Sequence, residues 1–444
     1  MSARRIPAWG RRSVLLAPLA LSGCGLWNQW FGEHKVPLPG TRVPVMTFPN
    51  GLHVGEAAPR VELPPPVANA AWPETGGNPA HAMGHLRLAD SLRVAWQADI
   101  GSGGGYRRKI TAQAVAAQGR VFTMDSDARV RAFDLASGRQ LWEQSTRAKG
   151  NRSSNIGGGI SWDGGRLFAG TGRGDLLALD DASGKILWRH DLEEPARAAP
   201  TVADGLVFVL TMDNRLVTVA RDDGRALWSY QAAGTVTPVL GLPSPAYADG
   251  LVVAGFNSGE LACLRAASGT MVWGDSLASP GGRDSVADLS AVHGMPVIAD
   301  GKVYAGSLGG LVLALDLRTG RRLWEQALAV ADTAAVAGDW LFVLDTNQQL
   351  AAIRRTDGVA AWVAQLPRFQ NEKDQSDPIF WVGPLLAGDR LVVGSNHGHA
   401  LSVSPYTGAI LGEQRVPGAV SVPPSLAAGT LLLVTDDATL VALR

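Results

Sequence analysis

The sequence predicts an all-β protein, an eight-bladed β-propeller of four-stranded antiparallel blades whose ring is closed by an N-terminal strand. Two observations predict this fold class. A tight turn followed by a tryptophan-bearing strand recurs along the chain, and the 444 residues include 53 glycines and 14 tryptophans, with 18% charged residues. A period of roughly 40–50 residues is typical of propeller blades. The composition suits strands and turns better than helices.

One complete unit runs from Met295 to Glu325. Four strands are expected in and just beyond it, at Pro296–Ala299, Lys302–Ser307, Leu311–Asp316 and Arg322–Ala327. Asp300-Gly301 separates the first two strands. An Asp-Gly pair between two strands is a strong hairpin signal, because both turn positions need a positive φ.

The closing turn and strand of this unit occur six times, each with tryptophan four residues after glycine: Gly138 and Trp142, Gly184 and Trp188, Gly224 and Trp228, Gly269 and Trp273, Gly320 and Trp324, Gly358 and Trp362. Successive tryptophans are 46, 40, 45, 51 and 38 residues apart, which matches one four-stranded blade with loops of varying length. A seventh unit, Val382–Val416, keeps Thr407-Gly408 but has Gly412 at the tryptophan position.

The eighth blade is expected to combine both ends of the fold. Val422–Arg444 supplies only three strands, and Leu92–Ile100, which carries Trp96, is a strand without a blade of its own. Pairing them removes the last open sheet edge of the ring. The repeat tryptophans are expected to pack between blades, because equivalent positions are spread around a circle and cannot form one ligand cage.

The chain before the propeller predicts an exported, lipid-anchored protein. Residues 1–23 are interpreted as a lipoprotein signal peptide, residues 24–88 as a lipidated, proline-rich tether and residues 89–444 as the propeller. The leader has four arginines, and its apolar stretch Val14–Leu21 is too short to span a bilayer. Leu21-Ser22-Gly23-Cys24 follows and resembles the lipobox of bacterial lipoproteins, which are cut before the cysteine.

Lipidation is therefore expected at Cys24, where acyl chains would hold the protein at a membrane. A cysteine that follows an ordinary signal peptide is the alternative. The next residue is Gly25 and not the aspartate that retains lipoproteins in the inner membrane. The resemblance thus implies the periplasmic face of the outer membrane.

Charge and cysteine content exclude other classes of protein. Without residues 1–23 the chain has 36 basic and 40 acidic residues, so it lacks the basic excess of a nucleic-acid binder. Cys24 and Cys263 are the only cysteines, and no disulfide framework follows from them. Cys263 lies in the strand-like run Glu260–Leu264 and is interpreted as a small buried residue, with a reactive thiol as the alternative.

His81 and His85 are spaced like two metal ligands on one helix face. Gly77, Pro79 and Gly84 disfavour that helix. A polar loop packed on the propeller is therefore preferred, and no metal site is predicted.

The repeat resembles a known superfamily. Ala314-Leu-Asp316-Leu-Arg-Thr-Gly320-Arg-Arg-Leu-Trp324 is similar to the tryptophan-docking signature of the pyrroloquinoline-quinone-type propellers, which include quinone-dependent dehydrogenases and binding proteins without a cofactor. Combined with the lipobox, the chain resembles the BamB family, the propeller lipoproteins of the outer-membrane β-barrel assembly machine, over about residues 90–444. The resemblance implies a non-catalytic scaffold with no cofactor. It would bind the barrel-forming subunit and unfolded outer-membrane proteins, and aid membrane insertion.

The resemblance also suggests where the partner binds. In the BamB family, neighbouring loops near the middle of the propeller hold the barrel-forming subunit. The loops before the fourth and fifth blades correspond here, although their local spacing differs from the family's and a leucine stands where an arginine is expected. Apolar anchors and a charged rim would come from Leu240, Leu242, Arg283, Asp284 and Asp288.

Two alternatives stay open, a quinone-dependent periplasmic dehydrogenase and a propeller that binds another envelope protein. By family resemblance, the dehydrogenase implies a calcium ion held by acidic and amide side chains, a catalytic aspartate and usually an adjacent cysteine pair. Two separated cysteines cannot supply that pair. The available carboxylates are expected to cap backbone amides at blade turns and not to bind ions: Asp125, Asp127, Asp213, Asp316 and Asp345.

Overall fold

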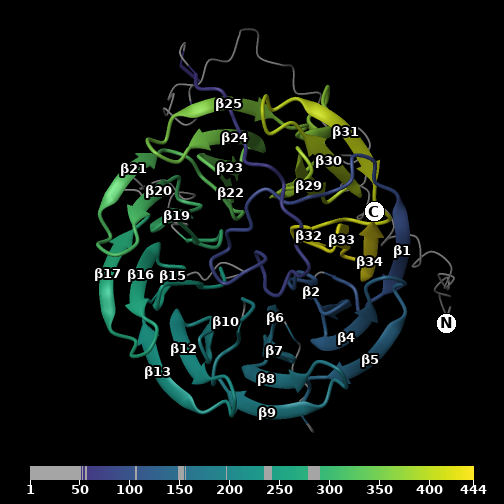
Figure 1. Ribbon diagram of the computed structural model, residues 1–444, viewed down its shortest axis with the longest axis vertical. Coiled ribbons are helices and arrows are strands. Elements are labelled where there is room, and N and C mark those ends of the chain that lie inside the picture. Colours follow the sequence, from purple (N-terminus) through teal and green to yellow (C-terminus); the bar gives the residue numbers. More distant parts are fainter. Residues whose placement is uncertain are drawn as a thin grey trace, which may run out of the picture. The chain divides into compact units, whose positions relative to one another are not determined.

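The computed structural model describes residues 52, 54–55, 58–105, 108–148, 155, 157–196, 198–234, 243–278 and 291–444. These residues form strands and no helix, and so contain no apolar helix that could cross a membrane. Thirty-two of the strands make eight antiparallel four-stranded sheets, arranged as blades around an axis (Figure 1).

The strands of each blade follow one another from the axis outward. Blade 1 is β2 (Val115–Ala117), β3 (Arg120–Met124), β4 (Arg129–Asp134) and β5 (Gln140–Ser145). Blade 2 is β6 (Gly158–Asp163), β7 (Arg166–Thr171), β8 (Asp175–Asp180) and β9 (Ile186–Asp191). Blade 3 is β10 (Thr201–Ala203), β11 (Leu206–Leu210), β12 (Arg215–Ala220) and β13 (Ala226–Gln231). Blade 4 is β14 (Ala246–Ala248), β15 (Leu251–Gly255), β16 (Glu260–Arg265) and β17 (Met271–Ser276).

The second half of the ring repeats this order. Blade 5 is β18 (Val297–Ala299), β19 (Lys302–Gly306), β20 (Val312–Asp316) and β21 (Arg322–Gln326). Blade 6 is β22 (Ala335–Ala337), β23 (Trp340–Leu344), β24 (Gln349–Arg354) and β25 (Ala360–Gln365), and a small hairpin follows it, β26 (Phe369–Asn371) with β27 (Ser376–Pro378). Blade 7 is β28 (Trp381–Leu386), β29 (Leu391–Ser395), β30 (His399–Val403) and β31 (Ile410–Arg415).

Blade 8 joins both ends of the fold. It consists of β32 (Ser425–Ala427), β33 (Thr430–Val434), β34 (Thr439–Leu443) and β1 (Val94–Asp99), the last pairing antiparallel with β34. The main chains of Arg93 and Arg444 add two hydrogen bonds at 2.8 and 3.0 Å. The predicted eight-bladed ring and its closure by an N-terminal strand are therefore confirmed, and the four strands expected in the fifth blade are shifted only at their ends.

Seven tryptophans tie each outer strand to the next blade. Each indole Nε1 donates a hydrogen bond, 2.7 to 3.1 Å long, to a main-chain oxygen of the following blade: Trp96, Trp142, Trp188, Trp228, Trp273, Trp324 and Trp362. Each ring also lies against the glycine of that blade's outer turn, where an added Cβ would come within 3.0 Å of the ring. The repeat glycine thus leaves room for the tryptophan of the preceding blade.

Gly412 is the exception, and the ring closure explains it. A tryptophan at this position of blade 7 would reach toward the outer turn of blade 8. No turn joins the two outer strands of blade 8, because β34 is the last of the described strands in chain order and β1 is the first. Nothing lies within 4 Å of a Cβ built on Gly412, whereas each repeat glycine of the outer turns is covered by an indole ring.

Residues 61–88, here called the axial cap, cross one end of the propeller (Figure 1). Trp72, Leu86 and Leu88 are buried in the core. The cap main chain bonds in turn to Ala428 of blade 8, Ala116 of blade 1, Trp162 of blade 2, Tyr247 of blade 4, Ile298 of blade 5 and Gly388 of blade 7. Although the sequence places these residues in the tether, this part of the chain packs on the propeller and pairs with its inner strands.

Candidate functional site

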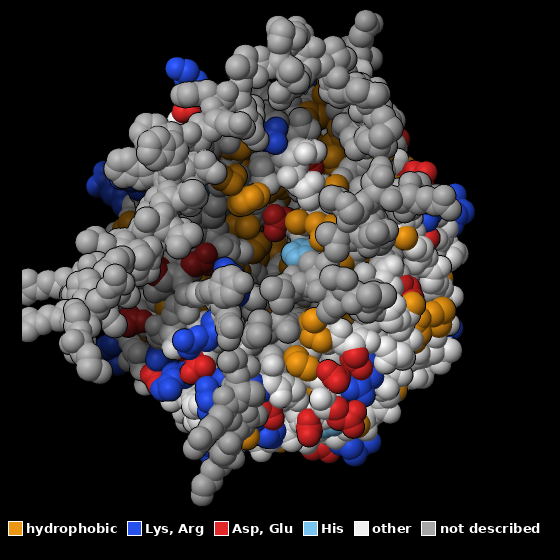
Figure 2. Space-filling view, turned by 180° about the vertical axis from the view of Figure 1, so that it is seen from behind, with side chains coloured by type: hydrophobic (Ala, Val, Ile, Leu, Met, Phe, Trp, Pro, Cys, Tyr) orange, Lys and Arg blue, Asp and Glu red, His pale blue; other side chains and the backbone are white. Residues whose placement is uncertain are grey.

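An axial cavity of about 470 Å³ lies inside the ring. Its wall combines the cap residues Trp72, Gly76 and Met83 with residues that precede the innermost strands of seven blades, at 109–111, 113, 157, 198–199, 243–244, 293, 295, 331–334 and 421–424. Blade 7 contributes residues 383–386 of β28, its innermost strand. Seen from the face opposite the cap, the centre is hollowed and shows hydrophobic, acidic and histidine side chains (Figure 2).

Gln113 holds the cap to the cavity wall. Its Oε1 accepts hydrogen bonds from Trp72 Nε1 at 3.0 Å and from the main-chain nitrogen of Gly76 at 2.9 Å. Its Nε2 donates to the main-chain oxygens of Pro423 and Pro424 at 3.1 and 2.8 Å. Both ends of this amide are therefore occupied, and Gln113 ties the cap to blades 1 and 8.

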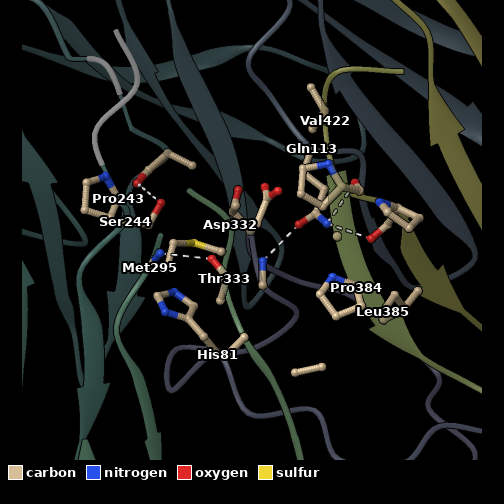
Figure 3. A pocket seen from close by; sticks show the side chains of 18 of the residues that line it. His81, Gln113, Pro243, Ser244, Met295, Asp332, Thr333, Pro384, Leu385 and Val422 are labelled. Carbon is tan, nitrogen blue, oxygen red and sulfur yellow. Dashed lines mark hydrogen bonds between the residues drawn. The ribbon is translucent and has the colours of Figure 1, made fainter. Parts of the chain in front are cut away.

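His81 is a buried, neutral imidazole on the cap side of the cavity (Figure 3). Its Nδ1 lies 2.7 Å from the main-chain oxygen of Pro296, so Nδ1 carries the proton. Burial lowers the pKa of His81 to about 4. Its Nε2 has no hydrogen-bond partner among the described residues. His85 donates in the same way from Nδ1 to Pro64 at 2.8 Å, so both histidines belong to the packed cap and not to a metal-binding helix.

Asp332 is the acidic side chain among the described residues of the cavity wall. It lies in the loop between β21 and β22, deep in the ring but in partial contact with the solvent of the cavity. Burial raises the pKa of Asp332 to about 7, while a hydrogen bond from the main-chain nitrogen of Gly383 opposes that rise. The carboxyl group therefore changes charge near neutral pH.

The described residues do not fit the calcium and quinone site of a dehydrogenase. Among them, no three His, Cys, Asp or Glu side chains lie close enough to hold a metal ion. Gln113, the amide on the wall, is already fully bonded. Cys263 is buried in β16, and burial raises the pKa of its thiol to about 12. It is therefore a packing residue, as the sequence suggests.

Most of the aspartates at the blade turns accept hydrogen bonds from groups of their own turn. Oδ1 of Asp125 accepts from the main-chain nitrogens of residues 127 and 129, and Oδ1 of Asp316 and of Asp345 accept likewise within their own turns. Asp213 accepts from the hydroxyl of Thr211 at 2.5 Å. Asp127 differs from the expectation, because its carboxylate pairs with arginine side chains of neighbouring loops.

The residues expected to carry the lipid and the partner lie outside the described residues: Cys24, Leu240, Leu242, Arg283, Asp284 and Asp288. The described ends of the two loops are informative. Pro243 and Ser244 follow the first loop, His293 and Met295 follow the second, and all four line the axial cavity. Figure 3 shows Pro243, Ser244 and Met295 there. Both loops therefore lead into neighbouring blades at the cavity wall.

Comparison with known proteins identifies the family. The family model described as "Outer membrane protein assembly factor BamB" matches residues 126–364, more than half of the chain. The chain belongs to the BamB family. A BamB of Bordetella pertussis is 29% identical over 359 residues, which cover 80% of this chain and 87% of that protein.

Solved structures agree with this fold. The crystal structure of BamB from Moraxella catarrhalis matches with a TM-score of 0.67 and 19% identity, covering 80% of this chain and all of that one. The quinohemoprotein alcohol dehydrogenase of Comamonas testosteroni matches with a TM-score of 0.65 and 15% identity, covering 84% of this chain and 80% of that one. At these identities the two structures share only the propeller fold with this chain, and BamB membership rests on the family match.

Neither Asp332 nor the cavity was predicted from the sequence. Asp332 stands in no motif, and only its place just before an innermost strand could have signalled that it lies near the axis. The repeat pattern does predict that position, because each blade begins with its innermost strand and residue 332 comes just before the first strand of blade 6.

Proposed function

We propose that this chain is a non-catalytic scaffold lipoprotein of the outer-membrane β-barrel assembly complex. It binds the barrel-forming subunit and aids the insertion of outer-membrane proteins. The match of the BamB family model to residues 126–364 carries the proposal. The protein is held by lipid on Cys24 at the periplasmic face of the outer membrane.

A rigid ring that presents variable loops supports a binding role. Seven indole bridges fix the blades relative to one another, so that loops of neighbouring blades keep a constant spacing. The loops before β14 and β18 carry the proposed contacts. Leu240 and Leu242 are the apolar anchors, and Arg283, Asp284 and Asp288 form the charged rim.

Charge reversal tests this assignment. The double variant Asp284→Lys and Asp288→Lys should weaken co-purification of the barrel-forming subunit from solubilised membranes at least tenfold, because charge complementarity at the interface is reversed. The matched control is Glu372→Lys with Asp374→Lys. It makes the same charge change at exposed positions between β26 and β27 and should leave co-purification unchanged.

Three other results would count against parts of the proposal. Full capture by the Asp284 and Asp288 variant would reject these site residues but keep the function. Failure of the parent protein to capture the subunit would reject the function. Reduction of a dye after addition of quinone and calcium would favour the dehydrogenase alternative.

A further inference from the structure

We propose that the axial cavity is a binding site for an alkyl cation, a chain that ends in an ammonium or guanidinium group, with Asp332 as its counter-ion. The chemistry is that of a free aliphatic amine or of a lysine or arginine side chain. This site is separate from the loop residues assigned above, and its test does not depend on the proposed partner.

Asp332 is held rigidly on the cavity wall. On one side of it, the main-chain oxygen of Ala331 lies 2.8 Å from Nδ1 of His293. On the other side, the hydroxyl of Thr333 accepts a hydrogen bond from the main-chain nitrogen of Met295 at 2.9 Å. Figure 3 shows Asp332 between Met295 and Thr333 on one side of the pocket and Gln113 and Pro384 on the other. These hydrogen bonds hold the loop that carries Asp332, which reduces the entropy cost of ordering it on binding.

Among the described residues, the carboxylate of Asp332 has no cationic partner. It accepts a hydrogen bond from the main chain of Gly383. In the part of the chain that the structure describes, no lysine, arginine or histidine lies within 4.0 Å of its oxygens. A largely desolvated carboxylate without a cationic partner is costly, and a cationic ligand reduces that cost.

Much of the rest of the described wall is apolar and suits an aliphatic stem, while Thr75 Oγ1 and His81 Nε2 are polar atoms there without a hydrogen-bond partner. Apolar groups surround the cavity, among them Ile110, Met295, Leu385 and Val422. The polar side chains of Gln113, Ser244 and Thr333 are already engaged with protein atoms. A charged head at Asp332 with a hydrocarbon stem along the wall would therefore satisfy both kinds of surface.

Ionisation of Asp332 gives the site a defined pH dependence. The other titratable groups on the described wall are His81, His293 and Lys109. Burial holds His81 neutral above its pKa of about 4. An aliphatic amine stays protonated near neutrality, so its affinity should follow the charged fraction of Asp332. With a pKa of about 7 that fraction, and hence the affinity, rises about tenfold from roughly pH 6 to roughly pH 8.

The test uses n-butylamine as the probe and n-butanol as its neutral match, titrated into the full chain carrying methyl-labelled methionine. Met83 and Met295 line the cavity and report binding by NMR, while Met271, exposed on β17, is an internal control. We expect saturable shifts of the Met295 methyl group with butylamine, about tenfold tighter at the higher pH. Butanol should show no such pH dependence.

Two variants separate Asp332 from the rest of the wall. Asp332→Asn should weaken butylamine binding at least tenfold and abolish its pH dependence. If His293 caused the pH dependence, that dependence would persist in this variant. Asp339→Asn removes an exposed acid of the same blade and should bind like the parent. The parent's amine and alcohol titrations decide the question even if Asp332→Asn fails to fold.

The proposal is overturned if butylamine gives no saturable shift at Met295, or if Asp332→Asn binds it as well as the parent. A short blocked peptide with one lysine distinguishes the two possible ligands, a free aliphatic amine and the side chain of another protein. Tighter binding of the peptide than of butylamine indicates a protein side chain, and weaker binding indicates a free amine. Either order supports the site.

Discussion

At the scale of single residues, one indole and one glycine per repeat set the contact between blades. The tryptophan contributes both buried area and a hydrogen bond to the next blade, and the glycine provides the space for the ring. Burial differs around the ring. Trp324 is 8% exposed, whereas Trp96 on the closing strand is only partly buried. The same substitution should therefore have unequal effects.

We predict that Trp324→Ala lowers the free energy of unfolding by about 5 kcal/mol and Trp96→Ala by about 3 kcal/mol, the two ends of the range for tryptophan truncation. Urea unfolding followed by circular dichroism measures both. Leu411→Ala serves as the control and should change stability by less than about 0.5 kcal/mol, since Leu411 is 59% exposed. A Trp96→Ala protein as stable as the parent would mean that the closing strand adds nothing to the ring.

At the scale of elements, the axial cap is an unusual addition to the blades. It has no strand ladder of its own and satisfies its main-chain groups through the inner strands of the propeller. Glu74 is its most buried charged residue. Oε1 of Glu74 accepts from the main-chain nitrogen of Val202 at 2.9 Å, while Oε2 has no partner among the described residues. Burial raises the pKa of Glu74 well above its ordinary value.

A raised pKa means that the folded protein keeps a proton that the unfolded chain loses. The contribution of Glu74 is fully present below the ordinary glutamate pKa and is lost as the pH rises through the raised value. We predict that Glu74→Gln matches the parent in stability at about pH 4 and exceeds it at neutral pH. Thermal unfolding across this range measures the difference. Glu62→Gln, at an exposed position of the cap, should follow the parent throughout, and an identical pH profile for Glu74→Gln would contradict the burial of Glu74.

At the scale of the whole molecule, the described residues form a closed ring. Each of the eight blades has four strands, because β1 completes the blade that β32, β33 and β34 begin. No helix among the described residues could span a bilayer. Membrane attachment is proposed to depend on the lipid at Cys24, because acyl chains add membrane affinity with every buried methylene.

We predict that Cys24→Ala moves the protein from the washed membrane fraction to the soluble periplasmic fraction. Fractionation followed by immunoblotting measures the shift, and Cys263→Ala, which removes the buried cysteine of β16, should remain with the membranes. If the Cys24→Ala protein still sediments with washed membranes, the propeller itself binds lipid or a membrane partner tightly.

The sequence by itself determined the ring. The Asp-Gly and Thr-Gly turns, the alternating strands and the tryptophan four residues after each glycine are local signals, and their repetition predicts the blade number and the closing strand. Even the missing tryptophan at Gly412 has its cause in chain order, since blade 8 has no outer turn to receive it. These features follow from neighbouring residues, and so they can be predicted without tertiary structure.

Only the tertiary structure decided what happens at the axis. Residues of all eight blades, far apart in the sequence, converge there with the cap, and no spacing in the sequence encodes which of their side chains meet. The proline content of residues 24–88 suggested an extended tether. The packing of residues 61–88 could not be predicted, because the hydrogen-bond partners of their main chain lie on strands distant in the sequence. In the sequence, Asp332 is an ordinary loop aspartate. Its pKa is raised because the folded ring removes its carboxyl group from bulk water.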